Sequence, residues 1–422
     1  MPRIRARNAN RSDRASRRRA RSAAAGSSPL RRVVLKAGRE KSLLRRHPWV
    51  FSGAIEEVEG APQAGDTVAI VSERDEFLAY GAYSPQSQIR ARVWSFDRNA
   101  TIDAVFFRDA IAAAIAYRND IVRGVNAIRL VHGESDGLPG LVVDRYADTA
   151  VMQCSSAGAD RWRDVLADAV IEHGRCARVF ERSDVEVRAL EGLEARVGIV
   201  RGDAPPPSIL IADGEARYLV DVRQGQKTGF FLDQRENRAQ VRQAAHGRDV
   251  LDVFCYSGGF TLAALIGGAR SVTALDSSSA ALAQARENLR VSGLADRGVE
   301  WIEGDAFATL RRLHAQGRRF DLIVLDPPKF APTEKHVARA ARAYKDVNLW
   351  ALRLLRPAGL LFTFSCSGGV DEALFQSIVA GAAVDASVAC RIVSRLAAAA
   401  DHPVALNFPE GAYLNGLMLA AV

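Results

Sequence analysis

Cysteine is scarce in this sequence, and the few cysteines are not spaced for cross-linking or metal binding. Among 422 residues there are five, an odd number, and no two form a Cys-x-x-Cys pair. Disulfide frameworks and structural zinc sites use paired, closely spaced thiols. We therefore expect no disulfide framework, no metal site and a reducing compartment. The cysteines are Cys154, Cys176, Cys255, Cys366 and Cys390.

Long apolar runs are also missing. No stretch approaches the roughly 18 residues that a membrane-spanning helix needs, and the arginine-rich start lacks the apolar segment of a secretory signal peptide. We expect a cytoplasmic protein with no membrane partner. Hydrophobic residues make up 48% and charged residues 25%, as in a folded globular chain, and the length suits two or three domains.

Acidic residues are nearly absent from the first 32 positions, which hold eleven arginines and only Asp13. The remaining residues carry 46 basic and 48 acidic side chains, so the net charge of +8 comes from this tail. Residues 1–31 have too few apolar side chains to bury a core, and we expect them to be disordered. Either they form an electrostatic RNA-binding arm, or they are dispensable and their arginines reflect compositional bias.

Short runs rich in β-branched and aromatic residues fill residues 32–103. Examples are 67–71 and 89–96, and glycine or proline separates the runs. This pattern is typical of short strands joined by tight turns, so it predicts a small β-rich domain.

Residues 104–215 combine two kinds of pattern. Helical periodicity runs over 104–123 and 160–173, and a hairpin is expected around 133–146. We interpret this part as a central α+β domain. Three consecutive prolines at 205–207 can continue neither a helix nor a central strand, and they mark the connection to the next domain.

Residues 216–422 alternate strands with helices. Such alternation predicts an α/β fold with a doubly wound, mostly parallel sheet that helices cover on both faces. Ligands of these sheets bind at the carboxyl ends of the strands. Strands are expected at 250–254, 271–275, 299–302, 322–325 and 360–364, and helices at 261–265 and 279–291.

A glycine-rich turn follows the first of these strands. Ser257, Gly258 and Gly259 would let the backbone turn tightly and approach a ligand at the start of a helix. The spacing GxGxxG, which cradles the pyrophosphate of a dinucleotide, is absent here. Ser257 and Gly258 are therefore candidates for binding a nucleoside rather than a dinucleotide.

Four aspartates end successive strands: Asp252, Asp276, Asp305 and Asp326. Asp276 can accept hydrogen bonds from both hydroxyls of a ribose, and Asp305 could bind an adenine amino group. The alternative is that these carboxylates cap the helices that follow them. Capping suffices for Asp276 taken alone, but it explains neither the glycine pair nor the two prolines after Asp326. The series therefore favours an adenosine ligand.

Eight segments spread over residues 31 to 422 match one known family in order. They are 38–42, 47–53, 133–140, 227–235 (KTGFFLDQR), 326–330 (DPPKF), 344–348, 365–368 (SCSG) and 409–414. With these segments the sequence resembles the bacterial 23S rRNA cytosine-5 methyltransferases of the large subunit methyltransferase I type. Only the arginine-rich tail lies outside the likeness.

The resemblance implies three domains: a PUA domain at 32–103, the central domain at 104–215 and a class I methyltransferase domain at 216–422. It also implies S-adenosyl-L-methionine as the cofactor. The implied partner is RNA, either 23S rRNA or a large-subunit precursor.

The resemblance further implies that the segment beginning at Thr228 wraps the cofactor. Thr228, Phe231 and Gln234 thereby become candidate cofactor ligands. Without the resemblance, Phe231 would be interpreted as core and Gln234 as part of a solvated helix start.

Methylation at C5 of cytosine requires help, because C5 becomes nucleophilic only after a thiolate has added to C6. Cys366 follows a predicted strand and precedes two glycines, so its side chain can emerge at the ligand-binding edge. Asp326 can share or donate a proton at N3 of the base. Some RNA cytosine-5 enzymes have a second cysteine where this chain has Pro328 and Lys329, and the base that removes the C5 proton is not assigned.

Three other interpretations remain open. Cys366 could be a small buried hydrophobe, which is the commonest state of a free cysteine. An rRNA N-methyltransferase of the same fold would use Asp-Pro-Pro to hold an exocyclic amino group and would need no thiol. A noncatalytic RNA-binding assembly factor would keep the fold without turnover, although Asp276, Asp326 and Cys366 argue against it.

Overall fold

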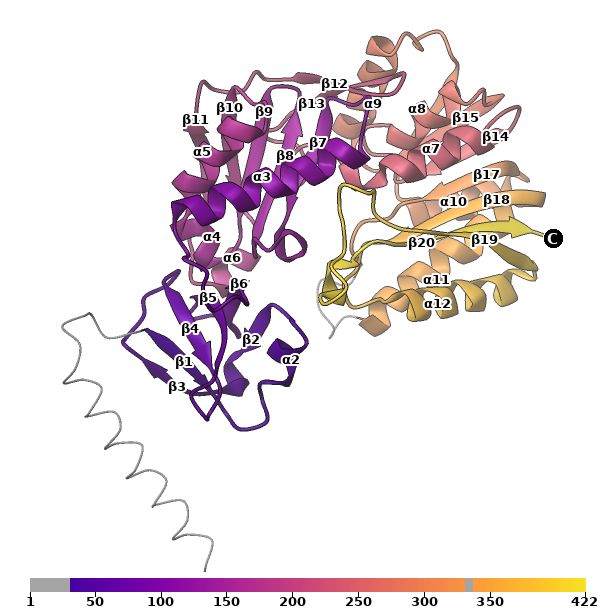
Figure 1. Ribbon diagram of the computed structural model, residues 1–422. Coiled ribbons are helices and arrows are strands. Elements are labelled where there is room, and N and C mark those ends of the chain that lie inside the picture. Colours follow the sequence, from indigo (N-terminus) through magenta and orange to yellow (C-terminus); the bar gives the residue numbers. More distant parts are fainter. Residues whose placement is uncertain (1–30, 331–336) are drawn as a thin grey trace, which may run out of the picture. The chain divides into compact units, whose positions relative to one another are not determined.

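The computed structural model describes residues 31–330 and 337–422, which form two compact units (Figure 1). Unit 1 comprises the described residues up to Asp103 together with Ser156–Trp162 and Glu186–Glu194. Unit 2 comprises the other described residues from Ala104 to the end of the chain. The tail at 1–31, for which we predict disorder, lies outside the described residues apart from Arg31.

Unit 1 is built on a six-stranded sheet in the order β2-β6-β5-β4-β1-β3. The alternating branched side chains of Val33, Val68 and Ile70 pack in its core. The predicted β-rich domain is therefore present. Its strands are β1 (Arg32–Leu35), β2 (Trp49–Phe51), β3 (Ile55–Glu59), β4 (Thr67–Val71), β5 (Phe77–Tyr83) and β6 (Ile89–Ser95), and its helices are α2 (Lys41–Leu44), α4 (Ala157–Arg161) and α6 (Val187–Leu190).

The first sheet of unit 2 has five strands in the order β11-β10-β9-β8-β7, and helices α3 and α5 pack on it (Figure 1). A separate two-stranded hairpin, β12 and β13, leads from it to the second sheet. The strands are β7 (Ala127–His132), β8 (Leu141–Tyr146), β9 (Thr149–Cys154), β10 (Arg178–Ser183), β11 (Arg196–Arg201), β12 (Ile209–Asp213) and β13 (Ala216–Val220), and the helices are α3 (Ala104–Ile121) and α5 (Arg163–His173).

The helix expected over 160–173 is confirmed from Arg163 to His173 as α5, but its start is wrong, because the preceding residues form a separate helix, α4, with a break at Trp162. The two helices belong to different units. Within unit 1, α4 packs so closely that a Cβ on Gly158 would lie 2.5 Å from the Trp94 ring. The sequence pattern predicts one helix here, whereas α4 packs in unit 1 and α5 packs in unit 2.

The hairpin expected around 133–146 begins earlier than predicted. Its first strand is β7, and residues 133–140 form the connection to β8, with a short 3-10 turn at Gly133–Asp136. The glycines at 133, 137 and 140 adopt positive φ, which accounts for the tight path of this connection.

The second sheet of unit 2 has seven strands in the order β16-β15-β14-β17-β18-β20-β19. All neighbours pair in parallel except β20, which runs antiparallel to β18 and β19. The strands are β14 (Asp249–Val253), β15 (Ser271–Asp276), β16 (Val299–Glu303), β17 (Phe320–Leu325), β18 (Leu355–Ser365), β19 (Cys390–Leu396) and β20 (Asn415–Ala421). The helices are α7 (Arg235–Ala244), α8 (Gly259–Ile266), α9 (Ser279–Val291), α10 (Ala306–Ala315), α11 (Val337–Leu354) and α12 (Glu372–Ala386), with short 3-10 turns at η3 (Leu232–Gln234) and η5 (Pro409–Gly411).

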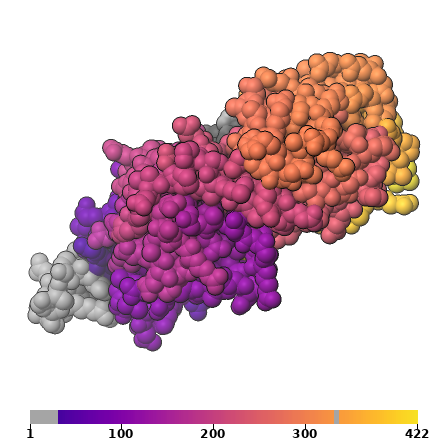
Figure 2. Space-filling model, turned by 90° about the horizontal axis from the view of Figure 1, so that it is seen from above, coloured from indigo at the N-terminus to yellow at the C-terminus, as the bar shows by residue number. Residues whose placement is uncertain are grey.

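Helices cover both faces of this sheet. One core lies between the sheet and α7, α8 and α9, and the other lies between the sheet and α10, α11 and α12. Val250 and Leu251 on β14 enter opposite cores, as the alternation of side chains along a strand requires. The segment around residue 300, orange in Figure 2, lies at the surface, and β16 is an edge strand. The predicted doubly wound α/β fold is confirmed.

None of the described helices is long and apolar enough to cross a membrane.

Candidate active site

The seven-stranded sheet changes its winding direction between β14 and β17. From β14 the chain continues outward to β15 and β16, and then returns to place β17 and β18 on the other side of β14. At such a switch point the connections leave in opposite directions and open a crevice at the carboxyl ends of the strands. Asp252, Asp276, Asp326 and Cys366 lie at the carboxyl ends of β14, β15, β17 and β18, respectively.

The turn after β14 has an unusual backbone. Phe254, Tyr256 and Gly258 all have positive φ, at 65°, 47° and 80°. Such conformations are strained for residues other than glycine and are often found at binding sites. A Cβ on Gly258 would lie 3.0 Å from the Cβ of Ala285 on α9, so only glycine fits there comfortably. The turn thus places the backbone of a residue without a side chain, Gly258, just before the start of α8.

The carboxylate of Asp276 braces this turn. One oxygen accepts a hydrogen bond from the backbone N–H of Tyr256 at 2.8 Å, and the other accepts one from Ser278 at 2.9 Å. Each oxygen has a second lone pair, and the side chain is only half-buried. Asp276 can therefore hold the turn and accept hydrogen bonds from a ligand at the same time.

Asp252 and Asp305 differ in their surroundings. Asp252 is fully buried below the turn, where Thr261 donates a hydrogen bond to its Oδ2 at 2.7 Å and Oδ1 has no partner among the described residues. Burial raises the pKa of Asp252 to about 7. Asp305 is exposed and caps α10 by accepting from the N–H of Ala308 at 2.8 Å. That is the contact that the capping interpretation requires, and an adenine contact for Asp305 stays a prediction.

Ser257 and Thr228 are both buried. The backbone oxygen of Ser257 accepts a hydrogen bond from the Asn288 amide at 2.9 Å. The Thr228 hydroxyl donates to Asp144 Oδ2 at 2.6 Å and lies 2.8 Å from the hydroxyl of Tyr146, both on β8. Thr228 therefore anchors its segment to the five-stranded sheet. A direct ligand role for either residue stays a prediction.

Lys227, the residue before Thr228, lies against the ring of Phe231. The ammonium of Lys227 lies 4.4 Å from the ring centre of Phe231 and forms an ion pair with Asp233 at 3.1 Å. Tyr413 donates a hydrogen bond to the same oxygen of Asp233 at 2.7 Å. Burial would raise the pKa of Asp233, but the charges of Lys227 and His402, together with the hydrogen bonds from Tyr413 and Lys227, outweigh it and hold that pKa well below its usual range. The Phe231 ring also meets the ring of Tyr256 edge to face, so it lies beside the turn after β14.

Gln234 contacts the carboxyl of Asp326. Its Nε2 donates a hydrogen bond to Asp326 Oδ2 at 3.0 Å. Burial, and next the negative charge of Asp233, raise the pKa of Asp326 to about 7. Asp326 can therefore carry a proton near neutral pH, as a proton donor to a base must.

Cys366 lies beside the same segment. Its Sγ is 3.8 Å from the backbone oxygen of Pro327, and the side chain is partly exposed. Burial, followed by the charge of Asp326, raises the pKa of Cys366 to about 11, while Lys227 and Lys329 oppose the rise. The Tyr344 hydroxyl on α11, 3.0 Å from Ser367 Oγ, helps to fix the loop that carries the thiol.

The sequence alone assigns no role to Lys227, Asp233, Asn237, Tyr344 or Tyr413. All except Asn237 lie inside the segments that carry the family resemblance, so that likeness was the available signal. Tyr413 and Asp233 are 180 positions apart and Tyr344 and Ser367 are 23 apart, so these pairs become neighbours only in the folded chain.

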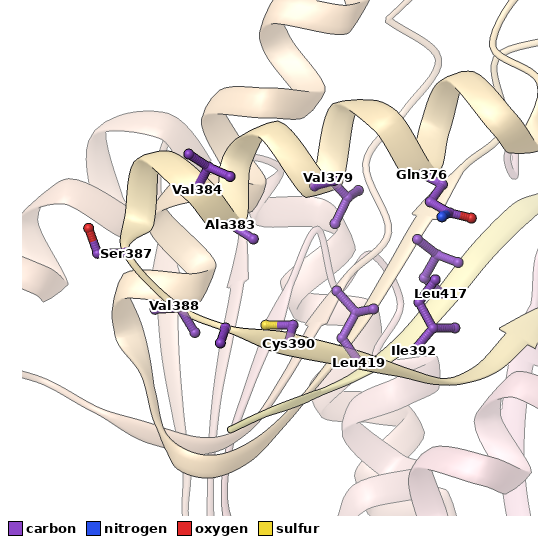
Figure 3. A pocket seen from close by; sticks show the side chains of 12 residues that line it. Gln376, Val379, Ala383, Val384, Ser387, Val388, Cys390, Ile392, Leu417 and Leu419 are labelled. Atoms are coloured by element: carbon purple, nitrogen blue, oxygen red, sulfur yellow. The ribbon is translucent and has the colours of Figure 1, made fainter.

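A separate apolar pocket of about 540 Å³ lies between α12 and the strands β19 and β20 (Figure 3). Valine, leucine and alanine side chains dominate its lining, and Gln376 and Ser387 contribute polar groups. None of the predicted site residues lines it. It lacks the carboxylates that a nucleoside would need, which the switch point has in Asp276 and Asp326.

Comparisons with known proteins agree with this geometry. Residues 33–96 match the family of PUA-like domains, and residues 202–406 match the family of S-adenosylmethionine-dependent methyltransferases. "Ribosomal RNA large subunit methyltransferase I" of Shewanella frigidimarina is 47% identical over 391 residues, which covers 92% of this chain and 98% of that protein. The protein of the same name from Shewanella denitrificans is 48% identical over 391 residues, with the same coverage. This chain belongs to the ribosomal RNA large subunit methyltransferase I family.

Solved structures show the same fold. A putative SAM-dependent methyltransferase from Streptococcus mutans has a TM-score of 0.79 at 20% identity, over 92% of this chain and 99% of that one. A putative methyltransferase complexed with SAH has a TM-score of 0.80 at 20% identity, with the same coverage.

The predicted cofactor is confirmed: as a member of this family, the protein uses S-adenosyl-L-methionine. The residues at the switch point fit that cofactor. The turn at Gly258 brings backbone to the start of α8, and the half-buried carboxylate of Asp276 can accept hydrogen bonds from ribose hydroxyls.

Proposed function

We propose that this protein transfers a methyl group to C5 of a cytosine in 23S rRNA. The observation that carries the proposal is the pairing of a thiol with a protonatable carboxyl at the ends of adjacent parallel strands. Cys366 follows β18, Asp326 follows β17, and the thiol lies 3.8 Å from the carbonyl of Pro327, the residue after Asp326. A single cytosine could meet both groups there.

In the proposed reaction the Cys366 thiolate adds to C6 of the cytosine. The carboxyl of Asp326 gives its proton to N3, so that the ring does not accumulate negative charge. Lys227 and Lys329 favour the thiolate by their charge. The electron-rich C5 then takes up the methyl group.

When held at the glycine turn and Asp276, S-adenosyl-L-methionine would supply that methyl group as an electrophile and would leave as S-adenosylhomocysteine. After the transfer C5 releases its proton to solvent, the bond between sulfur and C6 breaks, and N3 returns its proton to Asp326. The Cys366 thiolate and the Asp326 carboxyl are thereby restored.

RNA as the partner is part of the same proposal. It is supported by the PUA-like domain at 33–96 and by the name of the Shewanella relatives, which act on ribosomal RNA of the large subunit. We also propose cytoplasmic location and the division into domains at 32–103, 104–215 and 216–422. The hairpin of β12 and β13 straddles the second of these boundaries.

A second candidate is methylation of an exocyclic amino group by the same fold. The observation that favours it is the burial that raises the pKa of Cys366 to about 11, because a thiol with that pKa is mostly un-ionised at neutral pH. Direct attack by an amino group needs no thiolate.

Mass spectrometry of nucleosides from 23S rRNA of a deletion strain distinguishes the two. Our proposal predicts loss of one 5-methylcytidine, restored by the wild-type gene and not by Cys366→Ala. Loss of an N-methylated nucleoside instead would establish the second candidate.

A further inference from the structure

Three hydrogen bonds link a backbone carbonyl to the carboxyl of Asp326 through two buried amides. Asn237 Nδ2 donates to the backbone oxygen of Ala397 at 3.0 Å and to Gln234 Oε1 at 2.6 Å. Gln234 Nε2 in turn donates to Asp326 Oδ2 at 3.0 Å. Gln234 and Asn237 are 3% and 2% exposed, so water does not compete for these contacts.

The partners determine which end of each amide is the nitrogen. The oxygen of Ala397 can only accept, so the NH₂ group of Asn237 must face it. That same NH₂ group faces Gln234, whose oxygen must therefore accept. The remaining end of the Gln234 amide is its NH₂ group, and this is what Asp326 meets. A flipped Gln234 would set two donors against each other at Asn237.

We propose that Asn237 and Gln234 are positioning residues for the carboxyl of Asp326, holding an N–H donor on Oδ2 so that the acidic proton resides on Oδ1. Neither residue needs to touch the base. Gln234, which the sequence suggested as a cofactor ligand, acts here through Asp326.

The hydrogen bonds from Ala397 through Asn237 and Gln234 to Asp326 form a relay, and its placement in the fold supports this role. Gln234 is the residue before α7, and Asn237 lies one turn into that helix, so both amides are attached to a rigid element. Asn237 also ties the start of α7 to Ala397, just after β19. A donor fixed in this way stabilises the ionised carboxyl and opposes the burial and the charge of Asp233, both of which favour its proton.

The relay can be tested without RNA and without turnover, by titrating the full-length protein labelled with carboxyl-¹³C aspartate. The signal of Asp326 is identified by its loss in Asp326→Asn. Gln234→Met removes the donor at nearly constant volume and should shift the pKa of Asp326 upward by about one unit. Gln243→Met makes the same chemical change at an exposed position of α7 and should leave that pKa unchanged.

Asn237→Leu frees Gln234 to turn its oxygen toward the protonated carboxyl, so it should also raise the pKa of Asp326. Because Asn237 acts through Gln234, adding Asn237→Leu to Gln234→Met should produce no further shift. If Asn237→Leu does not fold, as judged by thermal unfolding, Asn237→Ser replaces it. With RNA, the break in the pH profile of kcat/KM should move with the titrated pKa, while the affinity for the cofactor stays constant.

No shift in Gln234→Met relative to Gln243→Met would overturn the proposal, as would a second, additive shift in the double variant. The part of the proposal that concerns catalysis rests on the proposed function, whereas the titration does not. An N-methylated product with a normal titration result would therefore refute the cytosine-5 reaction and leave the relay standing.

Discussion

Asp326 and Cys366 must react in a combination of protonation states that is rare at any pH. The reaction needs Asp326 protonated and Cys366 ionised, whereas their pKa values are raised to about 7 and about 11. Between these values the falling fraction of protonated Asp326 offsets the rising fraction of thiolate. Only a small and nearly constant fraction of the protein is then in the reactive state.

We predict that kcat/KM rises about tenfold per pH unit up to about pH 7 and is level above it. In Asp326→Asn this break should disappear, and the rise should continue toward the pKa of the thiol, which falls because the Asp326 charge is gone. The rate itself should drop by about 10² or more. Asp203→Asn, an exposed change, should keep the wild-type profile. A break at pH 7 that persists in Asp326→Asn would assign it to another group.

Asp276 allows a separate prediction about the cofactor. Asp276→Ala removes a carboxylate that can hold both ribose hydroxyls and that also braces the turn after β14. Charge-assisted hydrogen bonds contribute about 1.5 to 3 kcal/mol, so the Kd for S-adenosyl-L-methionine should increase about tenfold to a hundredfold or more. Titration calorimetry measures this, with Asp203→Ala as the control. Equal affinities would remove Asp276 from the cofactor site.

At the scale of elements, the sequence predicts five of the seven strands of the second sheet of unit 2 but neither β19 nor β20, and it does not predict the contacts of Asp233 with Lys227 and Tyr413. Strands buried on both faces are short apolar runs that end in aspartate or glycine, and these signals are local. Asp233 and Tyr413, by contrast, are 180 positions apart and share no pattern along the chain. The helix expected over 160–173 begins too early for a related reason, since no helix-breaking residue in the sequence marks the break at Trp162.

The glycine turn gives a prediction for this scale. Gly258→Ala combines a positive φ with a Cβ that would lie 3.0 Å from Ala285, so it should destabilise both the packing of α8 on α9 and the cofactor site. Gly293→Ala has a similar φ of 70° and meets nothing within 4 Å, so it carries the backbone penalty alone, about 1 to 2 kcal/mol. Thermal unfolding should show a larger loss for Gly258→Ala, and only that variant should weaken cofactor binding. Equal losses in the two variants would mean that the close approach to α9 is unimportant.

At the scale of the whole molecule, the net positive charge of the chain comes from the arginine-rich tail. Removal of residues 1–30, which retains the ion pair between Arg31 and Asp66, should leave thermal stability and cofactor binding unchanged. If the tail is an RNA-binding arm, the plot of log affinity for RNA against log salt should become less steep, by about 0.7 to 0.9 for each phosphate that the tail no longer neutralises. An unchanged slope would identify the tail as dispensable, and a loss of stability would contradict its predicted lack of core.

The central claim is a covalent bond between Cys366 and C6 of the target cytosine, and trapping that bond tests it most directly. Target RNA carrying 5-fluorocytidine cannot release a proton from C5, so the adduct should accumulate. We predict that the wild-type protein and Cys390→Ala form a complex with this RNA that resists denaturation, and that Cys366→Ala forms none while still binding S-adenosyl-L-methionine. Normal methylation by Cys366→Ala, or an N-methylated base as the only product, would contradict the account.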